Sequence, residues 1–192
     1  MISALALMLA QAAPGAAQPQ PIPSIEQARG EISDLDSQLF WAAFEGCDPK
    51  ALKPLLAEDF RMLHDLAGLA APSRKAFIAN FEQQCAARAK GGANEGYRNR
   101  RLLVPGTRQV TPLGQWGVLE RGYHTFHELR QRPAGALGAD DPGGRSWVQT
   151  GGARYIHVWK WIGEEGRFRL QESISVDHGS AIPYPPADRS PD

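Results

Sequence analysis

Hydrophobic positions recur at three- and four-residue steps near the start of the chain, whereas they alternate with polar positions towards its end. Ser24 is placed to cap a helix, and Gln27 is placed to complete a capping box. The apolar residues that follow form one helical stripe as far as Gly46: Ile25, Ala28, Ile32, Leu35, Leu39 and Ala42. This pattern predicts an amphipathic helix whose apolar side faces a core.

Two further helices and a strand are indicated by similar signals. Asp48 followed by Pro49 is typical of the N-cap and first turn of a short helix, here ending near Ala57. The segment "DFRMLHD" alternates as a short strand does, and "LAGLAAP" after it predicts a turn. Ser73 then caps a third helix, which ends at Gly91. Its apolar stripe consists of Phe77, Phe81 and Cys85.

The rest of the chain has strand composition, divided by Gly and Pro. Strands are predicted over residues 97–104, 108–111, 116–128, 154–162 and 167–176. The stretch "RPAGALGADDPGGRS" reads as a long hairpin loop between the third and fourth of them. The order helix, helix, strand, helix and then antiparallel strands predicts an α+β fold with the helices on one face of the sheet.

Several of these segments together resemble the nuclear transport factor 2-like (NTF2-like) superfamily, and more narrowly its SnoaL-like branch, which contains many domains of unknown function. They are "IEQARGEISDLDSQLFWAAFEGCD", "LLAEDF", "SRKAF" and "HVWKWIGEEGRFRLQESISVDH", spread over residues 25–178. The resemblance implies a cystatin-like roll, in which a curved antiparallel sheet wraps over helices to form an open cone. Members include isomerases, dehydratases, cyclases and binding modules. The chain departs from many relatives in having Phe168 in place of Trp, and in its long insert at residues 131–150, which either covers the mouth of the cone or decorates it.

The two ends of the chain differ from its middle. Residues 1–23 combine an apolar run, "MISALALMLAQA", with a Pro- and Gln-rich tether, and resemble a secretory signal that lacks its usual Lys or Arg. The apolar run is shorter than the roughly 20 residues that a membrane-spanning helix needs. We therefore expect an exported or periplasmic protein with no stable membrane span, a single domain over residues 24–179, and a Pro-rich tail over 180–192.

Charge excludes some partners. The chain has 21 basic and 21 acidic residues and a formal net charge of +0. Without an excess of positive charge, nucleic acid is not expected as a partner. Arg98, Arg100 and Arg101 are accordingly interpreted as a solvated strand face.

The closing hairpin places titratable groups on an otherwise apolar face. With "GEEG" as the turn, His157 lies opposite Glu172, and Ser173 and Ser175 face away from both. One face then carries Tyr155, His157, Trp159, Trp161, Phe168, Leu170, Glu172, Ile174, Val176 and His178. Two interpretations of His157 and Glu172 stay open. They satisfy each other as a buried pair, or the carboxylate orients the imidazole so that its other nitrogen acts on a ligand.

Other residues are predicted to line the same pocket. His64 shares the inward parity of Phe60 and Met62. Of His124 and His127 only one can point inward, and we favour His124. The further candidates for the cavity wall are Trp41, Tyr97, Tyr155, Trp159, Ile174 and His178. His64, His124 and His157, from different strands, are a candidate metal set, but neither a metal nor a cofactor is predicted.

Cys47 and Cys85 are the only cysteines. In an exported protein they are a candidate disulfide, whereas in the cytosol they would be two buried thiols. We expect the disulfide, since the helices that carry the two cysteines must pack on the same sheet face.

These features predict an exported domain that binds an apolar small molecule in an aromatic pocket. If the pocket is catalytic, which the sequence leaves open, the chemistry is that of a cofactor-free isomerase, dehydratase or cyclase with His157 as general acid or base and Glu172 as its partner. The alternative is a non-catalytic domain that uses the open sheet face for protein interaction or for assembly into a homodimer.

Overall fold

A computed structural model describes residues 18–132, 138 and 140–179. The helical elements are α1 (Ile25–Phe40), the π-helical turn η1 (Trp41–Glu45), α2 (Pro49–Leu52), the 3-10 turn η2 (Lys53–Leu55) and α3 (Arg74–Arg88). The strands are β1 (Leu56–His64), β2 (Gly68–Ala71), β3 (Asn99–Leu103), β4 (Gln109–Pro112), β5 (Gly117–Gln131), β6 (Arg145–Ile162) and β7 (Arg167–Gly179). Of the predicted segments, residues 1–17 and the tail 180–192 lie outside the described residues.

The helices begin where the capping residues predicted. The Ser24 side chain accepts a hydrogen bond from the Gln27 backbone, and the Gln27 side chain accepts one from the Ser24 backbone, which completes the capping box. Asp48 caps α2 through the backbone N–H groups of Lys50 and Ala51. Ser73 caps α3 in the same way. These local contacts satisfy amide groups that a helix start leaves without partners.

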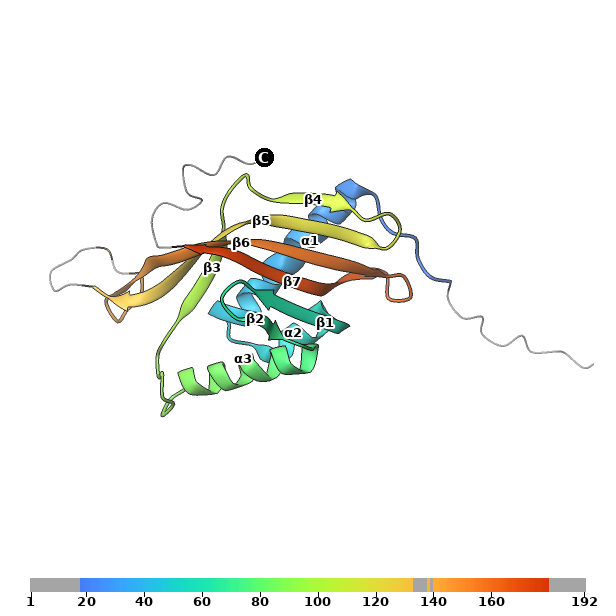
Figure 1. Ribbon diagram of the computed structural model, residues 1–192. Coiled ribbons are helices and arrows are strands. Elements are labelled where there is room, and N and C mark those ends of the chain that lie inside the picture. The colour runs from blue at the N-terminus through green and yellow to red at the C-terminus, as the bar shows by residue number, and fades with distance from the viewer. Residues whose placement is uncertain (1–17, 133–137, 139, 180–192) are drawn as a thin grey trace, which may run out of the picture.

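The strands form one open sheet in the order β2-β1-β7-β6-β5-β3, with β4 also paired to β5. The long strands β5, β6 and β7 run side by side in Figure 1, and α3 lies beyond their lower edge. All pairings are antiparallel except that of β1 with β7, which is parallel. The fold is therefore α+β, as predicted, with a mixed sheet in place of the purely antiparallel one.

One predicted turn proves to be a strand. Part of "LAGLAAP" forms β2, which pairs antiparallel with the end of β1. The turn itself lies earlier, at residues 65–67, and Gly68 follows it with a φ of 64°. Glycine adopts this left-handed conformation without the clash that a Cβ would cause. The segment that was predicted as a turn therefore contains both the turn and the second strand of the β1–β2 hairpin.

The core lies between the sheet and the helices. Buried side chains from β1 and β6 (Phe60 and Trp159) pack in one cluster with those of α1 and α3 (Ile32 and Phe77). Trp159 and Phe60 are both 0% exposed. Burial of such large side chains is the main favourable contribution to folding.

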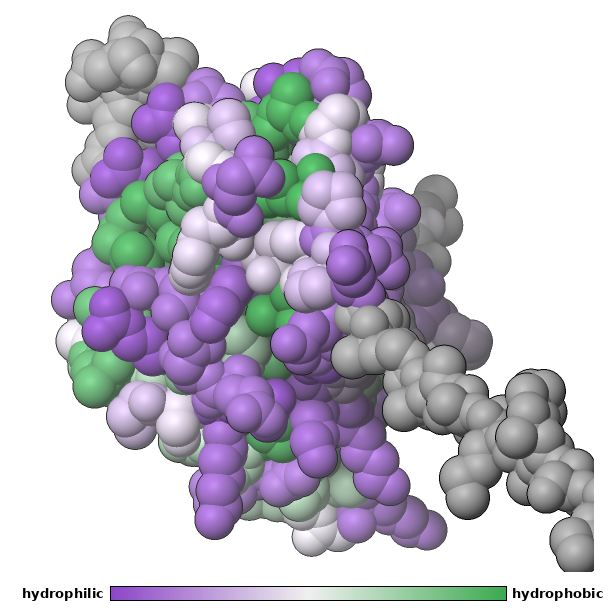
Figure 2. Space-filling view, turned by 90° about the vertical axis from the view of Figure 1, so that its right-hand side faces the viewer, coloured by the Kyte–Doolittle hydropathy of each residue, from purple (hydrophilic) through white to green (hydrophobic). Residues whose placement is uncertain are grey.

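Some large hydrophobic side chains remain at the surface. The face seen in Figure 2 is mostly hydrophilic, with hydrophobic residues gathered mainly in its upper part. The exposed large hydrophobic residues are Trp41, Leu66, Leu69, Tyr97, Leu102, Leu113, Trp116 and Val148. Within the described residues, no helix has the length and apolar character required to cross a membrane.

Candidate functional site

Strands β5 and β6 present a row of polar and aromatic side chains towards the helices. On β6 buried and half-buried residues alternate, so that Tyr155, His157 and Trp159 share the inner face. On β5, Glu120 pairs with His157 and Gly122 pairs with Tyr155. A Cβ at Gly122 would lie only 3.0 Å from the Tyr155 ring. Glycine at this position therefore lets the ring lie across the neighbouring strand.

The predicted pairing of His157 with Glu172 is wrong. The hairpin begins as predicted, with Ile162 opposite Arg167 and Trp159 opposite Leu170. The register then shifts at a bulge, and Val158, not His157, lies opposite Glu172. A bulge adds one residue to one strand, so every later residue changes face.

The same bulge exchanges the faces of the residues around Glu172. Glu172 points to the outer side, where it accepts hydrogen bonds from the exposed Arg61 (Nη2 to Oε2, 3.0 Å). Ser173 lies opposite His157, and Ser173 and Ser175 line the inner cavity, contrary to prediction. Ile174 alternates with them, and it does not line the cavity.

His157 instead faces two other carboxylates. Its Nδ1 lies 3.1 Å from Asp36 Oδ1 and 3.6 Å from Glu120 Oε2. Asp36 comes from the buried stripe of α1, one turn after Ile32. The three side chains are at most 2% exposed. A helix and two strands thus bring one imidazole and two carboxylates together in the interior.

Arg108, just before β4, adds a positive charge beside the two carboxylates. Its Nη2 lies 2.7 Å from Asp36 Oδ2, and its Nε lies 2.9 Å from Glu120 Oε1. Glu120 also accepts hydrogen bonds from the Tyr155 hydroxyl (3.0 Å) and from Trp159 Nε1 (2.8 Å). Each of the four carboxylate oxygens therefore has a donor or cation beside it, as buried charges require.

Burial and charge shift the pKa values of the cluster in different directions. Burial alone would lower the pKa of His157, but hydrogen bonds and negative charge from Asp36 and Glu120 raise it to about 9. Burial raises the pKa of Asp36, and the nearby charge of Glu120 adds to this effect. For Glu120 burial is outweighed by His157, Trp159 and Arg108, so its pKa is lowered. At neutral pH His157 is therefore protonated.

A cavity of about 340 Å³ opens beside His157. Its apolar lining comes mainly from the helices and the β1–β2 hairpin: Leu39, Phe40, Ala43, Phe44, Met62, Ala70, Ala71, Phe77 and Phe81. Its polar lining comes mainly from α3 and the inner face of the sheet: Asn80, Gln84, Asn99, Arg101, His124, Tyr155, His157, Ser173 and Ser175. Because Nδ1 of His157 faces the two carboxylates, Nε2 is the ring nitrogen that remains for a ligand. A protonated ring on the cavity wall can thus donate from Nε2 to a ligand.

Besides Ile174, three more of the predicted pocket residues do not line the cavity. Trp159 is buried but does not reach the cavity. Trp41 is 53% exposed and borders a second hollow beside α1 and β3. Tyr97 is 38% exposed, stacks on Arg88 and hydrogen-bonds Glu128. Trp41 begins η1 and Tyr97 precedes β3, so neither belongs to the inner face of the sheet, and residue type alone does not reveal this.

His64 and His178 form a separate group with Asp65 at the ends of β1 and β7. Asp65 Oδ1 lies 2.6 Å from Nδ1 of His178 and 3.3 Å from Nδ1 of His64. The two imidazole rings stack with centroids 4.1 Å apart. Neither histidine lines the cavity described above. The metal set weighed from the sequence, His64 with His124 and His157, is therefore not assembled.

Two groups of described residues place three ligand atoms within 4.8 Å of one another: His64, Asp65 and His178, and Asp36, Glu120 and His157. In the first group His64 Nδ1 already accepts a hydrogen bond from the Leu66 N–H, and His178 Nδ1 already contacts Asp65 Oδ1. In the second group Arg108 already supplies a cation to both carboxylates. The geometry of both groups suits proton sharing better than metal binding.

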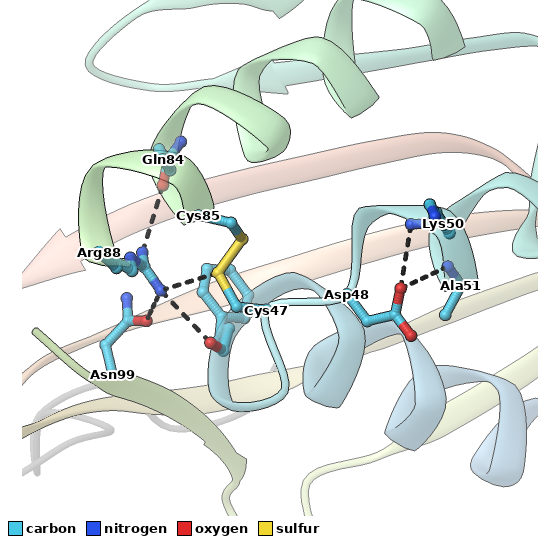
Figure 3. The surroundings of a disulfide bond; sticks show 9 residues. Cys47, Asp48, Lys50, Ala51, Gln84, Cys85, Arg88 and Asn99 are labelled. Atoms are coloured by element: carbon cyan, nitrogen blue, oxygen red, sulfur yellow. Dashed lines mark hydrogen bonds between the residues drawn. A yellow bond between two sulfur atoms is a disulfide. The ribbon is translucent and has the colours of Figure 1, made fainter. Parts of the chain in front are cut away.

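The predicted disulfide between Cys47 and Cys85 is present (Figure 3). The Cα atoms of Cys47 and Cys85 are 5.7 Å apart, so the bond joins the segment after η1 to α3. Beside it, Arg88 donates hydrogen bonds to the Phe44 carbonyl oxygen (3.3 Å) and to Asn99 Oδ1 (2.9 Å). Because Phe44 and Asn99 line the cavity, the disulfide and Arg88 hold this wall in place.

The sequence interpretation missed four residues of the site. Glu120 shares the inward parity of His124, and Asp36 shares the helical spacing of Ile32, so both could have been found from periodicity. Arg101 was interpreted as part of a solvated face, yet it lines the cavity. Arg108 precedes a short strand and carries no local signal of burial.

No protein-family model and no curated protein matches the chain. Solved structures do match its fold. An NTF2-like protein with a cystatin-like fold from Novosphingobium aromaticivorans is 17% identical, with a TM-score of 0.56 over 79% of this chain and 82% of that one. A Catenulispora acidiphila protein in complex with S-DNPA is 11% identical, with a TM-score of 0.55 over 78% and 94%.

A third match is a putative calcium/calmodulin-dependent protein kinase II association domain from Xanthomonas campestris. It is 20% identical, with a TM-score of 0.50 over 90% of this chain and 99% of that one. At these identities the likeness concerns the fold. The chain therefore has the NTF2-like, cystatin-like fold that its sequence resembles.

Proposed function

We propose that this protein binds an apolar small molecule in its inner cavity and that His157 donates a proton or hydrogen bond to that molecule. The observation that carries the proposal is the placement of His157: its Nδ1 faces two buried carboxylates, and the residue also lines the cavity. Structural imidazoles are normally satisfied on both nitrogens. In His157 the carboxylates lie on the Nδ1 side, so Nε2 is the nitrogen that we assign to the ligand.

The residues that line the cavity indicate the size and polarity of the ligand. Four phenylalanines supply an apolar surface, and the volume of about 340 Å³ suits a molecule of two or three rings. The match to a protein in complex with S-DNPA supports a binding role for this fold. Ser173 and Ser175 add hydroxyl groups at the wall opposite the helices.

If the protein is an enzyme, the chemistry follows from the charge of His157. As an imidazolium it donates the Nε2 proton to a carbonyl or hydroxyl oxygen of the ligand and becomes neutral. Asp36 and Glu120 hold the ring through Nδ1 and favour its return to the charged form. This arrangement fits a cofactor-free isomerisation, dehydration or cyclisation, with His157 acting first as an acid.

Binding can be tested with the uncharged fluorescent probe phenylnaphthylamine and, for the natural ligand, by native mass spectrometry of protein purified from its own host. Ala70 lies on the cavity wall, whereas its neighbour Leu69 is 56% exposed. We expect Ala70→Phe to weaken probe binding and Leu69→Phe, the matched control, to leave it unchanged. A probe that binds both variants equally well lies outside the cavity and contradicts the proposal.

The role of His157 requires a second comparison. His157→Gln removes the proton donor, and His127→Gln removes a histidine that does not line the cavity. We expect only the first to reduce turnover or binding of the ligand that mass spectrometry identifies. If His157→Gln lowers stability while binding per folded molecule is unchanged, His157 is a structural residue only.

A second proposal, self-association, is supported by the outer face of the sheet. In the part of the chain that the structure describes, no helix covers Leu119, Ile156, Val158 and Ile174, which are half-buried and lie on adjacent strands. The matching structure described as an association domain is in line with this use of the fold. In sedimentation experiments we expect the wild type to be a dimer and Ile156→Glu, which places a charge on this face, to be a monomer.

A further inference from the structure

Arg101 is a cation inside the cavity that no carboxylate neutralises. It lies on β3 opposite Phe126, on the same inner face as Asn99, and both line the cavity. Its guanidinium carbon is 4.2 Å from the ring centroid of Phe44 and 4.4 Å from that of Phe126. Among the described residues no acidic side chain forms an ion pair with it. The two aromatic rings therefore hold the guanidinium in place without cancelling its charge.

Arg108 differs from Arg101 in having acidic partners. Arg108 also approaches the interior, but it pairs with both Asp36 and Glu120. Burial lowers the pKa of Arg101 to about 10, and the side chain therefore stays charged at neutral pH. Even a half-buried cation without an anion is unfavourable, and an anionic ligand would remove that penalty.

His124 adds an unused donor next to Arg101. Its Nε2 is 3.4 Å from Arg101 Nη1. Because a guanidinium can only donate, Nε2 is the acceptor, and the ring carries its proton on Nδ1. His124 is 1% exposed, and Nδ1 has no hydrogen-bond partner in the described part of the chain. Burial and the charge of Arg101 hold the pKa of His124 well below its usual range, so the ring is neutral.

We propose that Arg101 and His124 form an anion-binding subsite, and that the ligand of the cavity is an organic acid with an apolar body. Its carboxylate or equivalent oxyanion accepts hydrogen bonds from the Arg101 guanidinium and from His124 Nδ1, while its apolar part packs against Phe40 and Phe44. This inference rests on the proposed binding function and names the chemical class of the ligand.

The subsite also orients the ligand relative to His157. The Tyr155 ring contacts both histidines, with centroids 5.3 Å from His124 and 4.7 Å from His157. An acid group held beside His124 therefore places the adjoining part of the molecule over Tyr155 and towards His157. The anionic group is the anchor, and His157 acts on the part next to it.

Two fluorescent probes that differ only in an acid group test the inference: anilinonaphthalene sulfonate and its uncharged parent phenylnaphthylamine. Replacing the charged donor in Arg101→Gln is expected to weaken the sulfonate on the order of tenfold or more, because hydrogen bonds between charged groups are the stronger ones. The affinity for phenylnaphthylamine should change by less than about twofold. Arg98→Gln, on an exposed arginine near the start of the same strand, is the matched control and should change neither affinity.

A second variant tests the subsite if Arg101→Gln does not fold. Arg101→Lys keeps the charge and loses the planar guanidinium, so it should weaken the sulfonate selectively but less than Arg101→Gln does. Equal changes for both probes in these variants, or no change for either, would overturn the subsite while leaving the binding function intact. A wild type that binds neither probe in the cavity contradicts the binding function itself.

Discussion

His157 Nδ1, on strand β6, lies 3.1 Å from Asp36 Oδ1, on helix α1, and this contact joins the sheet to the helical layer in the interior of the protein. Glu120 and Arg108 complete the group, so that two cations meet two carboxylates. Such a group is sensitive to the loss of any member, because each remaining charge would be buried without compensation.

The first prediction concerns pH. The pKa of His157 is raised from 6.5 to about 9 in the folded protein, which corresponds to about 3 kcal/mol of stabilisation by the protonated form. Because the folded pKa is the higher one, this stabilisation is complete below about pH 6.5 and is lost as the pH rises through about 9. Urea unfolding between pH 6 and pH 10 should show the decline, roughly over this window. The decline should be much smaller in His157→Gln, and an equal decline in both proteins would contradict the prediction.

The second prediction concerns Arg108. Arg108→Gln leaves Asp36 and Glu120 facing each other with only His157 as a cation, and it should reduce the free energy of unfolding by about 3–5 kcal/mol. Arg121→Gln is the control, because Arg121 is exposed and its side chain donates a hydrogen bond to the uncharged Gln109. It should cost less than about 1 kcal/mol. Chemical unfolding at pH 7 measures both, and similar losses for the two variants would argue against the buried network.

The third prediction tests the strand register with two glutamates. Glu172 forms an ion pair with the exposed Arg61, so Glu172→Gln should cost less than about 1 kcal/mol. Glu120 is 0% exposed and accepts from Tyr155 and Trp159, so Glu120→Gln should cost roughly 3 kcal/mol or more. The two variants should also differ in the pKa of the His157 ring, which only Glu120→Gln lowers. Comparable effects of the two changes would contradict this register and support the pairing of His157 with Glu172.

The fourth prediction concerns Gly122. Gly122→Ala places a methyl group about 3.0 Å from the Tyr155 ring, which must then shift, at a cost of about 1–3 kcal/mol. Gly30→Ala is the opposite case, since nothing lies within 4 Å of the new methyl group and the residue is inside a helix. It should stabilise the protein by about 0.5–1 kcal/mol. Thermal unfolding measures both changes, and a neutral effect of Gly122→Ala would show that Tyr155 does not lie where we place it.

The fifth prediction concerns the disulfide between Cys47 and Cys85. It spans a sequence separation of 38, and in the loop-entropy model a closure of this length stabilises the fold by about 4 kcal/mol. Reduction, or Cys47→Ser with Cys85→Ser, should therefore lower the melting temperature. Binding of phenylnaphthylamine should also weaken, since the bond holds the wall that carries Phe44. Two free thiols in protein folded under oxidising conditions would contradict the prediction.

Local signals in the sequence determined much of the fold. The helix caps at Ser24, Asp48 and Ser73 are formed by contacts within four residues, so the starts of the helices could be predicted. Alternation placed Tyr155 and His157 on the inner face, because a strand imposes a period of two. The disulfide between Cys47 and Cys85 followed from the packing of two predicted helices on the same sheet face.

The partners of His157 were decided by the tertiary structure. One additional residue at the bulge in β7 turned Glu172 outwards and Ser173 inwards, and no local pattern marks where a bulge will form. Asp36 and Arg108 reach His157 from segments far apart in the chain, because α1 packs against the sheet beside β4. Periodicity determines which face of its own element a side chain occupies. Which charges meet across two elements depends on how those elements pack. The cost of burying a charge is offset only by an oppositely charged group that folding brings close to it.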